Sequence, residues 1–414
     1  MEQCTASNSP AVSQRVHTAQ IAIQSNSAFS ALTSALTTAA EAAPSPRLQQ
    51  IARARQVVLS EGASAPALLP EDWIERSWRR CLAQGQRPGQ EVAFELLAPQ
   101  SRRRTEEANH CLVQAARPVL EQLGQAIAST RYFAILTNAQ GVVVDVNGPI
   151  DRRDRRADLI SRVGVDLSEA SVGTTAIGAA LTEQRPVWLH RGEHFFDATS
   201  AYSCAGAPVF GPDGLCAGML DLTGVDAPER PELRHLVVQS ARSIENALMQ
   251  HRPHALLLRI NWPGAHLDDE GDGLVCLDAD GWVTGANPAA RQMVAALSAR
   301  PAAAALHASE LFALPHERFF EAAQKVASSR SHGMPVLDVP LWSGLRLAAL
   351  ALPPGNSGWP RHAASPPAPE RPLKDLETAL IHQAVAQARG NVMQAARALG
   401  ISRATVYRRL GKKH

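Results

Sequence analysis

The sequence predicts a multidomain α+β protein that ends in an all-α helix-turn-helix domain. Two long segments combine short apolar strands, glycine-marked turns and helical patterns, which is typical of α+β domains. The C-terminal segment instead contains three helical patterns joined by two tight breaks. With 414 residues, the chain has room for two or three domains with separate cores.

The N-terminal part is predicted to be a flexible segment followed by helices. Residues 1–46 are rich in Ala, Ser, Thr and Gln and have few bulky apolar side chains, so we expect them to stay flexible or weakly helical. Residues 47–112 form a helical N-terminal region. Its clearest pattern is PEDWIERSWRRCLAQG at 70–85, where the apolar residues lie at helical spacing. These residues are Trp73, Ile74, Trp78, Cys81 and Leu82.

Residues 113–252 are predicted to form the first α+β domain. The string RYFAILTNAQGVVVDV at 131–146 indicates a strand, a turn and a second strand. A helix is expected from Arg230 to Met249, where apolar side chains form one stripe. Further strands are expected at 186–189, 205–210 and 216–223.

Residues 268–352 are predicted to form a second, smaller α+β domain. DGLVCLDADGWVTGANPAARQMV indicates strand, turn, strand and a helix that opens after Asn287. Strands near 336–340 and 345–352 would complete its sheet. The next segment, 353–372, contains seven prolines and is expected to be a semi-rigid linker.

Residues 373–414 carry the signals of a helix-turn-helix. Gly390 is expected to end the first helix, and Asn391 can cap the second. Gly400 then makes the sharp turn, and Ser402 caps the third helix, which Val406 anchors inward. Such a third helix is suited to enter a DNA major groove.

The polar face of the third helix is basic. Thr405, Arg408, Arg409 and Lys412 fall on one side, and Arg403 lies in the first turn, where recognition helices touch base edges. Residues 371 to 414 hold nine Lys and Arg against two acidic residues, whereas the whole chain has a net charge of only +2. Because neutralising phosphates releases counterions, this cluster favours double-stranded DNA as a partner. The alternative is a solvated amphipathic tail.

The C-terminal segment resembles the Fis-type helix-turn-helix of bacterial enhancer-binding regulators. The shared pattern is G-N-x-x-x-A-A-R-x-L-G-I-S-R-x-T-x-Y-R-R-L, within about residues 373–411. In that family the first helix, here about 373–388, helps dimerisation. The resemblance therefore implies a homodimer, although the Pro-rich stretch leaves no room for the family's longer dimerisation helix. It also implies that Ser402, Arg403, Thr405, Arg408 and Arg409 face DNA.

The middle of the chain resembles the acetoin-catabolism-regulator family. The strings that carry the resemblance are SWRRC, VGVDLSEASVGTTAIGAAL at 163–181, RGEHFF at 191–196 and CAGAPVFGPDGLCAGMLDLTG at 204–224. GLVCLDADGWVTGANPAA at 273–290 resembles the PAS-like part of these regulators. The resemblance implies a GAF-like sensor domain at 113–252 and a PAS-like domain at 268–352.

One part of that family's architecture has no counterpart in the sequence. No G-x-x-x-x-G-K-[ST] phosphate-binding loop occurs, and the GAFTGA signature is also absent. We therefore expect no AAA+ ATPase activity and no direct remodelling of the sigma factor. Such a protein would act by occupying DNA, by contacting RNA polymerase or by competing with a related full-length regulator.

A small-molecule effector site is expected in the GAF-like domain, in a mostly apolar pocket with few polar groups. Seven residues of the 188–204 stretch are candidates: Trp188, His190, His194, Phe195, Phe196, Tyr202 and Cys204. The alternatives are a packed core with surface histidines, a metal site that also uses Cys216, and a redox enzyme with Cys204 as nucleophile and His194 as base.

Composition narrows the function classes. The six cysteines include no C-x-x-C pair, so no zinc ribbon or disulfide framework is indicated, and we expect no metal, cofactor or catalytic residue. No apolar run approaches the ~18 residues of a membrane span, and no secretory signal is evident. The leading hypothesis is a cytoplasmic, ligand-responsive DNA-binding regulator. The main alternative is a sensor that binds a regulator protein instead of DNA.

Overall fold

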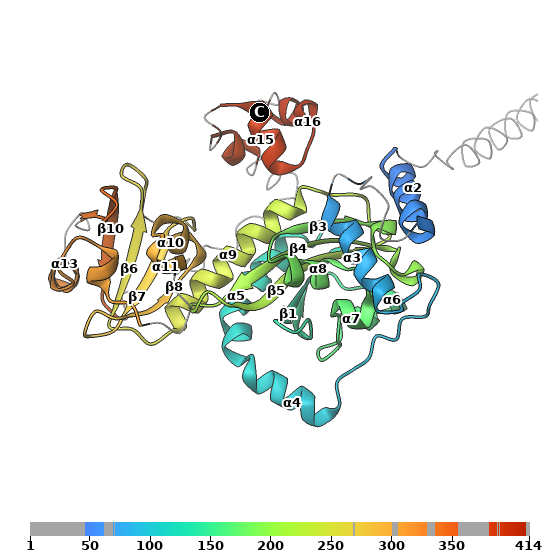
Figure 1. Cartoon of the computed structure of the whole chain (residues 1–414), viewed down its shortest axis with the longest axis horizontal. Coiled ribbons are helices and arrows are strands. Elements are labelled where there is room, and N and C mark those ends of the chain that lie inside the picture. Colours follow the sequence, from blue (N-terminus) through green and yellow to red (C-terminus); the bar gives the residue numbers. More distant parts are fainter. Residues whose placement is uncertain are drawn as a thin grey trace, which may run out of the picture. The chain divides into compact units, whose positions relative to one another are not determined.

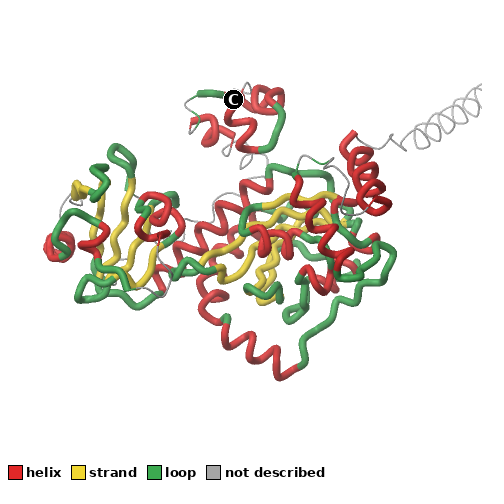
Figure 2. Tube along the Cα trace, in the orientation of Figure 1, coloured by secondary structure: helices red, strands yellow, loops and turns green. Residues whose placement is uncertain are grey.

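The structure is a computed structural model that describes residues 46–61, 69, 71–267, 270–299, 305–328, 336–354, 381–386, 388 and 390–410. Figures 1 and 2 show two separate blocks of strands, each with its own helices, and a small helical segment at the C-terminal end. The predictions for residues 1–45, for the Pro-rich residues 355–372 and for Lys412 lie outside the described residues.

Among the described residues, four helices precede the first strand. They are α2 (Pro46–Glu61), α3 (Asp72–Ala83), α4 (Pro99–Ala108) and α5 (His110–Ala126). The helix predicted within residues 70–85 is confirmed as α3, and its first turn carries two acidic side chains, which suit the positive end of the helix dipole. The boundary expected after residue 112 falls inside α5.

The first sheet has five antiparallel strands in the order β2-β1-β5-β4-β3. The strands are β1 (Tyr132–Asn138), β2 (Val143–Asn147), β3 (Val187–His190), β4 (Tyr202–Phe210) and β5 (Cys216–Val225). All five strands predicted from the sequence are present, including the β1–β2 hairpin. β1 and β5, the first and last strands of this sheet in chain order, are thus direct neighbours in it.

The two faces of this sheet carry different helices. Helices α5 and α9 (Leu233–His251) cover one face, and their apolar stripes pack against alternate residues of β1, β4 and β5. The other face carries the short helices α6 (Arg155–Ile160), α7 (Glu169–Val172) and α8 (Ala176–Glu183). Because strand side chains alternate between faces, the register decides which residues reach each layer.

The second sheet has five antiparallel strands in the order β8-β7-β6-β10-β9. They are β6 (Leu256–Asn261), β7 (Gly273–Leu277), β8 (Val283–Ala286), β9 (Leu337–Pro340) and β10 (Arg346–Leu352). Four of them were predicted, but β6, at the centre of the sheet, lies before the expected start of the domain at residue 268. Its short apolar run follows α9 so closely that periodicity alone cannot separate it from the helix.

Four helices of the described residues accompany the second sheet. They are α10 (Pro288–Met293), α11 (Ala296–Ala299), α12 (Ala308–Leu311) and α13 (Glu317–Ser328). The helix predicted after Asn287 is confirmed as α10, and the Asn287 side chain caps it by accepting from the backbone N–H of Ala290. None of the helices among the described residues is long and apolar enough to cross a bilayer.

The C-terminal segment contains a helix over residues 381–386, then α15 (Val392–Leu399) and α16 (Arg403–Leu410). One small core joins the three, made of Ile381, Ala384, Ala395, Ala396, Leu399 and Val406. Ala395 and Ala396 of α15 are buried, which fits the close crossing of the helices. Leu373, Leu376 and Leu380 lie outside the described residues.

Candidate functional site

A cavity of about 30 Å³ lies on the α7–α8 side of the first sheet. A buried water needs roughly 10–15 Å³ of such volume, so the cavity is about the size of two waters. It is lined by Phe94, Ile135, Ile160, Leu167, Val172, Thr175, Ala176, Ile177, His194, Thr199, Tyr202, Cys204, Asp221 and Thr223. This lining is mostly apolar, with a few polar groups from β5 and from the 194–204 stretch.

Three of the seven predicted pocket residues line this cavity: His194, Tyr202 and Cys204. Tyr202 and Cys204 are two residues apart on β4 and therefore point to the same face of the sheet. The Tyr202 hydroxyl donates to the backbone oxygen of Arg156 over 3.1 Å. All three side chains are buried.

Trp188 and His190 lie on the opposite face of the sheet. Trp188 is part of the core beneath α5 and α9, because β3 pairs it with Ala205, which also faces that core. His190 pairs with Ser203, and its Nδ1 lies 2.7 Å from the Ser203 hydroxyl oxygen. The structure therefore separates these two residues from the cavity by the thickness of the sheet.

Phe195 and Phe196 are buried but do not line the cavity. Their rings form an edge-to-face pair with centroids 5.1 Å apart. The Phe196 ring and the Phe195 Cβ lie close to Gly173, which has φ +66°, and a Cβ at that glycine would come within 2.8 Å of the Phe196 ring. The pair therefore fills the core beside α7 and fixes the end of that helix.

The sequence prediction missed Asp221, the most polar group of the cavity. Its carboxylate is 1% exposed, and burial raises its pKa to about 7. The Thr223 hydroxyl donates to Oδ2, whereas Oδ1 has no hydrogen-bond partner within the described part of the chain. The Cys204 Sγ lies 3.4 Å from the Thr223 hydroxyl oxygen, which completes a short polar chain.

His194 supplies a second acceptor to the cavity. Its Nδ1 lies 2.9 Å from the backbone oxygen of Arg191, and a carbonyl can only accept, so Nδ1 carries the proton. Burial lowers the pKa of His194 to about 4, which leaves the ring neutral. Nε2 is then an acceptor, and it has no partner among the described residues. Because unmet buried acceptors are costly, Asp221 and His194 together favour a ligand that brings O–H or N–H donors.

Residues far upstream hold the segment that carries His194. Arg55 donates to the backbone oxygen of His194 over 2.7 Å and to that of Phe195 over 2.5 Å. The Trp78 indole N–H donates to the backbone oxygen of Glu193 over 2.8 Å. Arg55 of α2 and Trp78 of α3 thus fix the segment that carries His194, although neither residue lines the cavity itself.

The geometry does not favour catalysis or metal binding at Cys204. Burial raises the pKa of the Cys204 thiol well above its usual value, so the nucleophilic thiolate is disfavoured. Across the residues that the structure describes, no group of three or more His, Cys, Asp or Glu side chains is placed to hold a metal ion.

The C-terminal helices carry the second candidate site. The Asn391 side chain accepts from the backbone N–H groups of Met393 and Gln394, which confirms it as the cap of α15. Gly400 adopts φ +66° in the turn, as expected. The Ser402 hydroxyl oxygen accepts from the backbone N–H of Thr405 over 3.1 Å and so caps α16.

The predicted DNA-facing residues are mostly exposed. Ser402, Arg403 and Arg408 are exposed and Thr405 is half-buried, whereas Val406 is fully buried against α15. Arg409 lies in α16. The structure adds Tyr407, which is 63% exposed on the same helix. The sequence pattern contained this tyrosine but gave no reason to place it outward.

A Fis-type domain forms the C-terminal end of the chain: residues 372–412 match the family described as bacterial regulatory protein, Fis family. Residues 47–246 match the family described as MimR, N-terminal domain. This second match begins in α2 and ends in α9, so it includes the upstream helices together with the first sheet.

Homologues of the chain are transcriptional regulators of acetoin-catabolism and MimR type. The acetoin catabolism regulatory protein of Cupriavidus necator is 32% identical over 53% of this chain and 34% of its own length. The acetoin dehydrogenase operon transcriptional activator AcoR of Bacillus subtilis is 30% identical, with 42% of this chain and 29% of the relative covered. The propane 2-monooxygenase operon transcriptional activator MimR of Mycolicibacterium smegmatis is 28% identical, with 47% and 33% covered. The matches therefore span about a third of each relative.

Among solved structures, one chain in the crystal structure of the E. coli DhaR(N)–DhaL complex is similar to this protein. The similarity covers 68% of this chain and 100% of the matched chain. The sequence identity is 15% and the TM-score is 0.41. A TM-score of this size does not assign the fold.

Proposed function

We propose that this protein is a ligand-responsive, sequence-specific DNA-binding transcriptional regulator. The observation that carries the proposal is an exposed basic helix, α16, held by a capped helix pair with its own small core. The Fis-family match covers these helices, and the named homologues regulate transcription. Ligand binding, rather than catalysis, is the role we assign to the first domain.

The DNA contacts would come from one face of α16 and its first turn. We assign base contacts to Arg403, with Ser402 and Thr405 beside it at the N-terminal end of the helix. Arg408, Arg409 and Lys412 would neutralise phosphates. A two-fold homodimer would bind an inverted repeat with half-sites about one helical turn apart.

The effector would bind the cavity beneath the first sheet, in a GAF-like domain. Asp221 and His194 offer two unmatched acceptors within an apolar lining, so a small molecule with a hydroxyl group fits this chemistry. Acetoin, which appears in the names of two relatives, is a four-carbon hydroxyketone with such a donor. Because the cavity is only about 30 Å³, an effector of this size would have to widen it. That movement would reach α3 through the segment at Glu193–Phe195.

The sequence motifs support the remaining parts of the proposed mechanism. It contains no phosphate-binding loop of the AAA+ type, so we propose that the chain acts without ATP-driven remodelling of a sigma factor. It would occupy DNA, contact RNA polymerase or compete with a related full-length regulator. The second domain would serve as a PAS-like sensor or as a dimerisation spacer.

Replacing Arg403 by Ala tests the DNA assignment. If Arg403 reads a guanine, the variant should lose roughly 1–3 kcal/mol of binding free energy on the best duplex. It should also discriminate less between the four bases at one position of the site. The measurement is fluorescence anisotropy with the full chain at fixed salt. Arg318→Ala is the matched control, because Arg318 is an exposed arginine of the second domain.

An unchanged affinity in Arg403→Ala would show that α16 is not the recognition helix. If the wild-type chain also held random and selected duplexes equally, a sensor that binds a partner protein in place of DNA would become the better description.

A further inference from the structure

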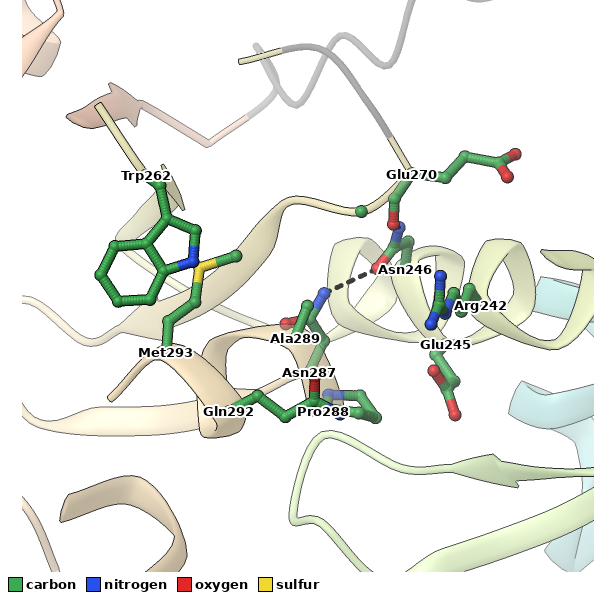
Figure 3. A pocket seen from close by; sticks show the side chains of 11 residues that line it. Arg242, Glu245, Asn246, Trp262, Glu270, Asn287, Pro288, Ala289, Gln292 and Met293 are labelled. Carbon is green, nitrogen blue, oxygen red and sulfur yellow. Dashed lines mark hydrogen bonds between the residues drawn. The ribbon is translucent and has the colours of Figure 1, made fainter. Parts of the chain in front are cut away.

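A second and larger cavity, of about 170 Å³, lies where α9 meets the second α+β domain. Figure 3 shows its walls: α9 on one side, and Trp262 and Met293 on the other. Its lining residues are Arg242, Glu245, Asn246, Trp262, Glu270, Gly271, Asn287, Pro288, Ala289, Gln292 and Met293. It shares no residue with the cavity beneath the first sheet.

A pair of buried amides fixes the floor of this cavity. The Asn287 amide nitrogen donates to Asn246 Oδ1 over 2.8 Å, and this bond joins α10 to α9 (Figure 3). Asn287 also donates to the backbone oxygen of Asp272, and its Oδ1 accepts from two backbone N–H groups. Because the donors and acceptors of Asn287 are already used, this amide shapes the cavity and does not read a ligand.

The carboxylates of the lining are also engaged. Glu245 is 6% exposed and accepts from the backbone N–H of Phe210 over 2.9 Å. Burial raises the pKa of Glu245 to about 7, so much of it is uncharged near neutral pH. Glu270 accepts from the Ser243 hydroxyl over 2.6 Å.

Two kinds of group remain available to a ligand. Arg242 is exposed, and none of the other described residues forms a hydrogen bond or ion pair with its guanidinium. Trp262 is 43% exposed, although an indole of this size is normally well covered. Figure 3 shows Met293 beside Trp262, so the apolar wall lies across the cavity from Arg242.

We propose that this cavity binds a small organic monoanion, whose carboxylate pairs with Arg242 and whose apolar ring packs on Trp262 and Met293. The size is suitable, because an apolar cavity of about 150 Å³ accommodates benzene, and this one measures about 170 Å³. A guanidinium binds a carboxylate through paired N–H donors, which a neutral or cationic ligand of the same shape would not use.

Such a ligand would link two parts of the molecule. It would contact α9, whose other side packs on the first sheet, and α10 of the second domain. The site would therefore act as a second input, distinct from the cavity that holds Asp221 and His194. By thermodynamic linkage, each ligand would alter the affinity for the other if both change the position of α9.

Nuclear magnetic resonance on the full chain tests the proposal with benzoate as the probe. The seven tryptophans, labelled with ¹⁵N, give separate indole N–H signals, and Trp262→Phe identifies that of Trp262. Benzoate should shift the Trp262 signal in a saturable way. Benzyl alcohol and benzylamine, which have the same ring without the carboxylate, should bind about 10- to 100-fold more weakly.

Matched variants separate this site from other sources of binding. Arg242→Gln should reduce the benzoate affinity to that for benzyl alcohol, whereas Arg318→Gln should leave it unchanged. Asp221→Asn, in the first cavity, should also leave it unchanged, so failure of the effector proposal does not affect this test. The proposal is overturned if benzoate does not shift the Trp262 signal, if the three probes act alike, or if Arg242→Gln binds benzoate as the wild type does.

Discussion

Asp221 and His194 show how burial sets the chemistry of single residues. Both line the same cavity, and burial shifts both toward their uncharged forms, with a pKa of about 7 for Asp221 and about 4 for His194. Near neutral pH the cavity then contains a neutral imidazole and a carboxyl group close to its titration point. In the proposed effector site, these two groups would accept hydrogen bonds without requiring a full charge on the ligand.

Replacing Asp221 by Asn should stabilise the first domain in a pH-dependent way. In the wild type the folded state holds this proton between pH 3.8 and about 7, so stability falls as pH rises through that range. The free energy of unfolding of the variant should therefore exceed that of the wild type by roughly 2–3 kcal/mol more at pH 8 than at pH 5. The measurement is the ratio of hydrogen-exchange rates of the β1 and β5 amides in the two proteins at each pH.

Comparing the variant with the wild type separates the effect of Asp221 on the pH dependence of stability from that of His194. The lowered pKa of His194 acts in the opposite direction, because its contribution to stability is lost as pH falls below its ordinary value of 6.5 toward about 4. Both proteins retain this histidine, so its effect cancels. A gain in stability that does not change with pH would contradict this assignment.

The same variant also tests the effector site. Acetoin, but not butanone, should raise the unfolding temperature of the wild type, and Asp221→Asn should lose this rise.

At the level of elements, the sequence predicted helix ends and hairpins well. The caps Asn391 and Ser402 and the turn at Gly400 follow from local chemistry, and all three are present. The faces of strands were harder to predict. Trp188 and His190 belong to the same strand region as the predicted pocket, but the β3–β4 register turns them toward α5 and α9. Register is a long-range property that local spacing does not contain.

Asp221 and β6 were missed for related reasons. Asp221 interrupts an apolar strand, and a single carboxyl group there gives no sign of whether it faces solvent or a cavity. Strand β6 lies directly after α9, and its place at the centre of the second sheet depends on pairing with β7 and β10. Neither feature can be read from residue spacing, because each depends on tertiary packing.

Replacing Asn391 by Ala tests the support of the recognition helix. The side chain caps α15 through two backbone N–H groups, and losing such a cap costs about 1 kcal/mol. Exchange of the α15 amides at Ala395–Leu399 should therefore accelerate by about fivefold, and binding to DNA should weaken. Gln394→Ala, at an exposed position of the same helix, is the matched control and should have little effect. Equal exchange in both variants would contradict the capping role.

At the level of the whole molecule, the first and second α+β domains are joined by a backbone hydrogen bond and by the Asn287–Asn246 amide pair. The backbone N–H of Ala286 donates to the oxygen of Pro212 over 2.8 Å, and Asn287 donates to Asn246 over the same distance. The hairpin between β4 and β5 and the helix α9 thus both connect the first α+β domain to the second. The family resemblance predicted the order of these parts, but the contacts between them depend on the folded surfaces.

The central claim is that α16 reads the edges of base pairs. The most direct measurement is a selection from random duplex DNA with the full chain at physiological salt, followed by competition against unselected duplexes. If α16 reads these edges, the selection should enrich an inverted repeat whose half-sites lie about one helical turn apart. The selected duplex should then outcompete random duplexes by at least about 1,000-fold. No enriched sequence, or equal retention of selected and random duplexes, would contradict it.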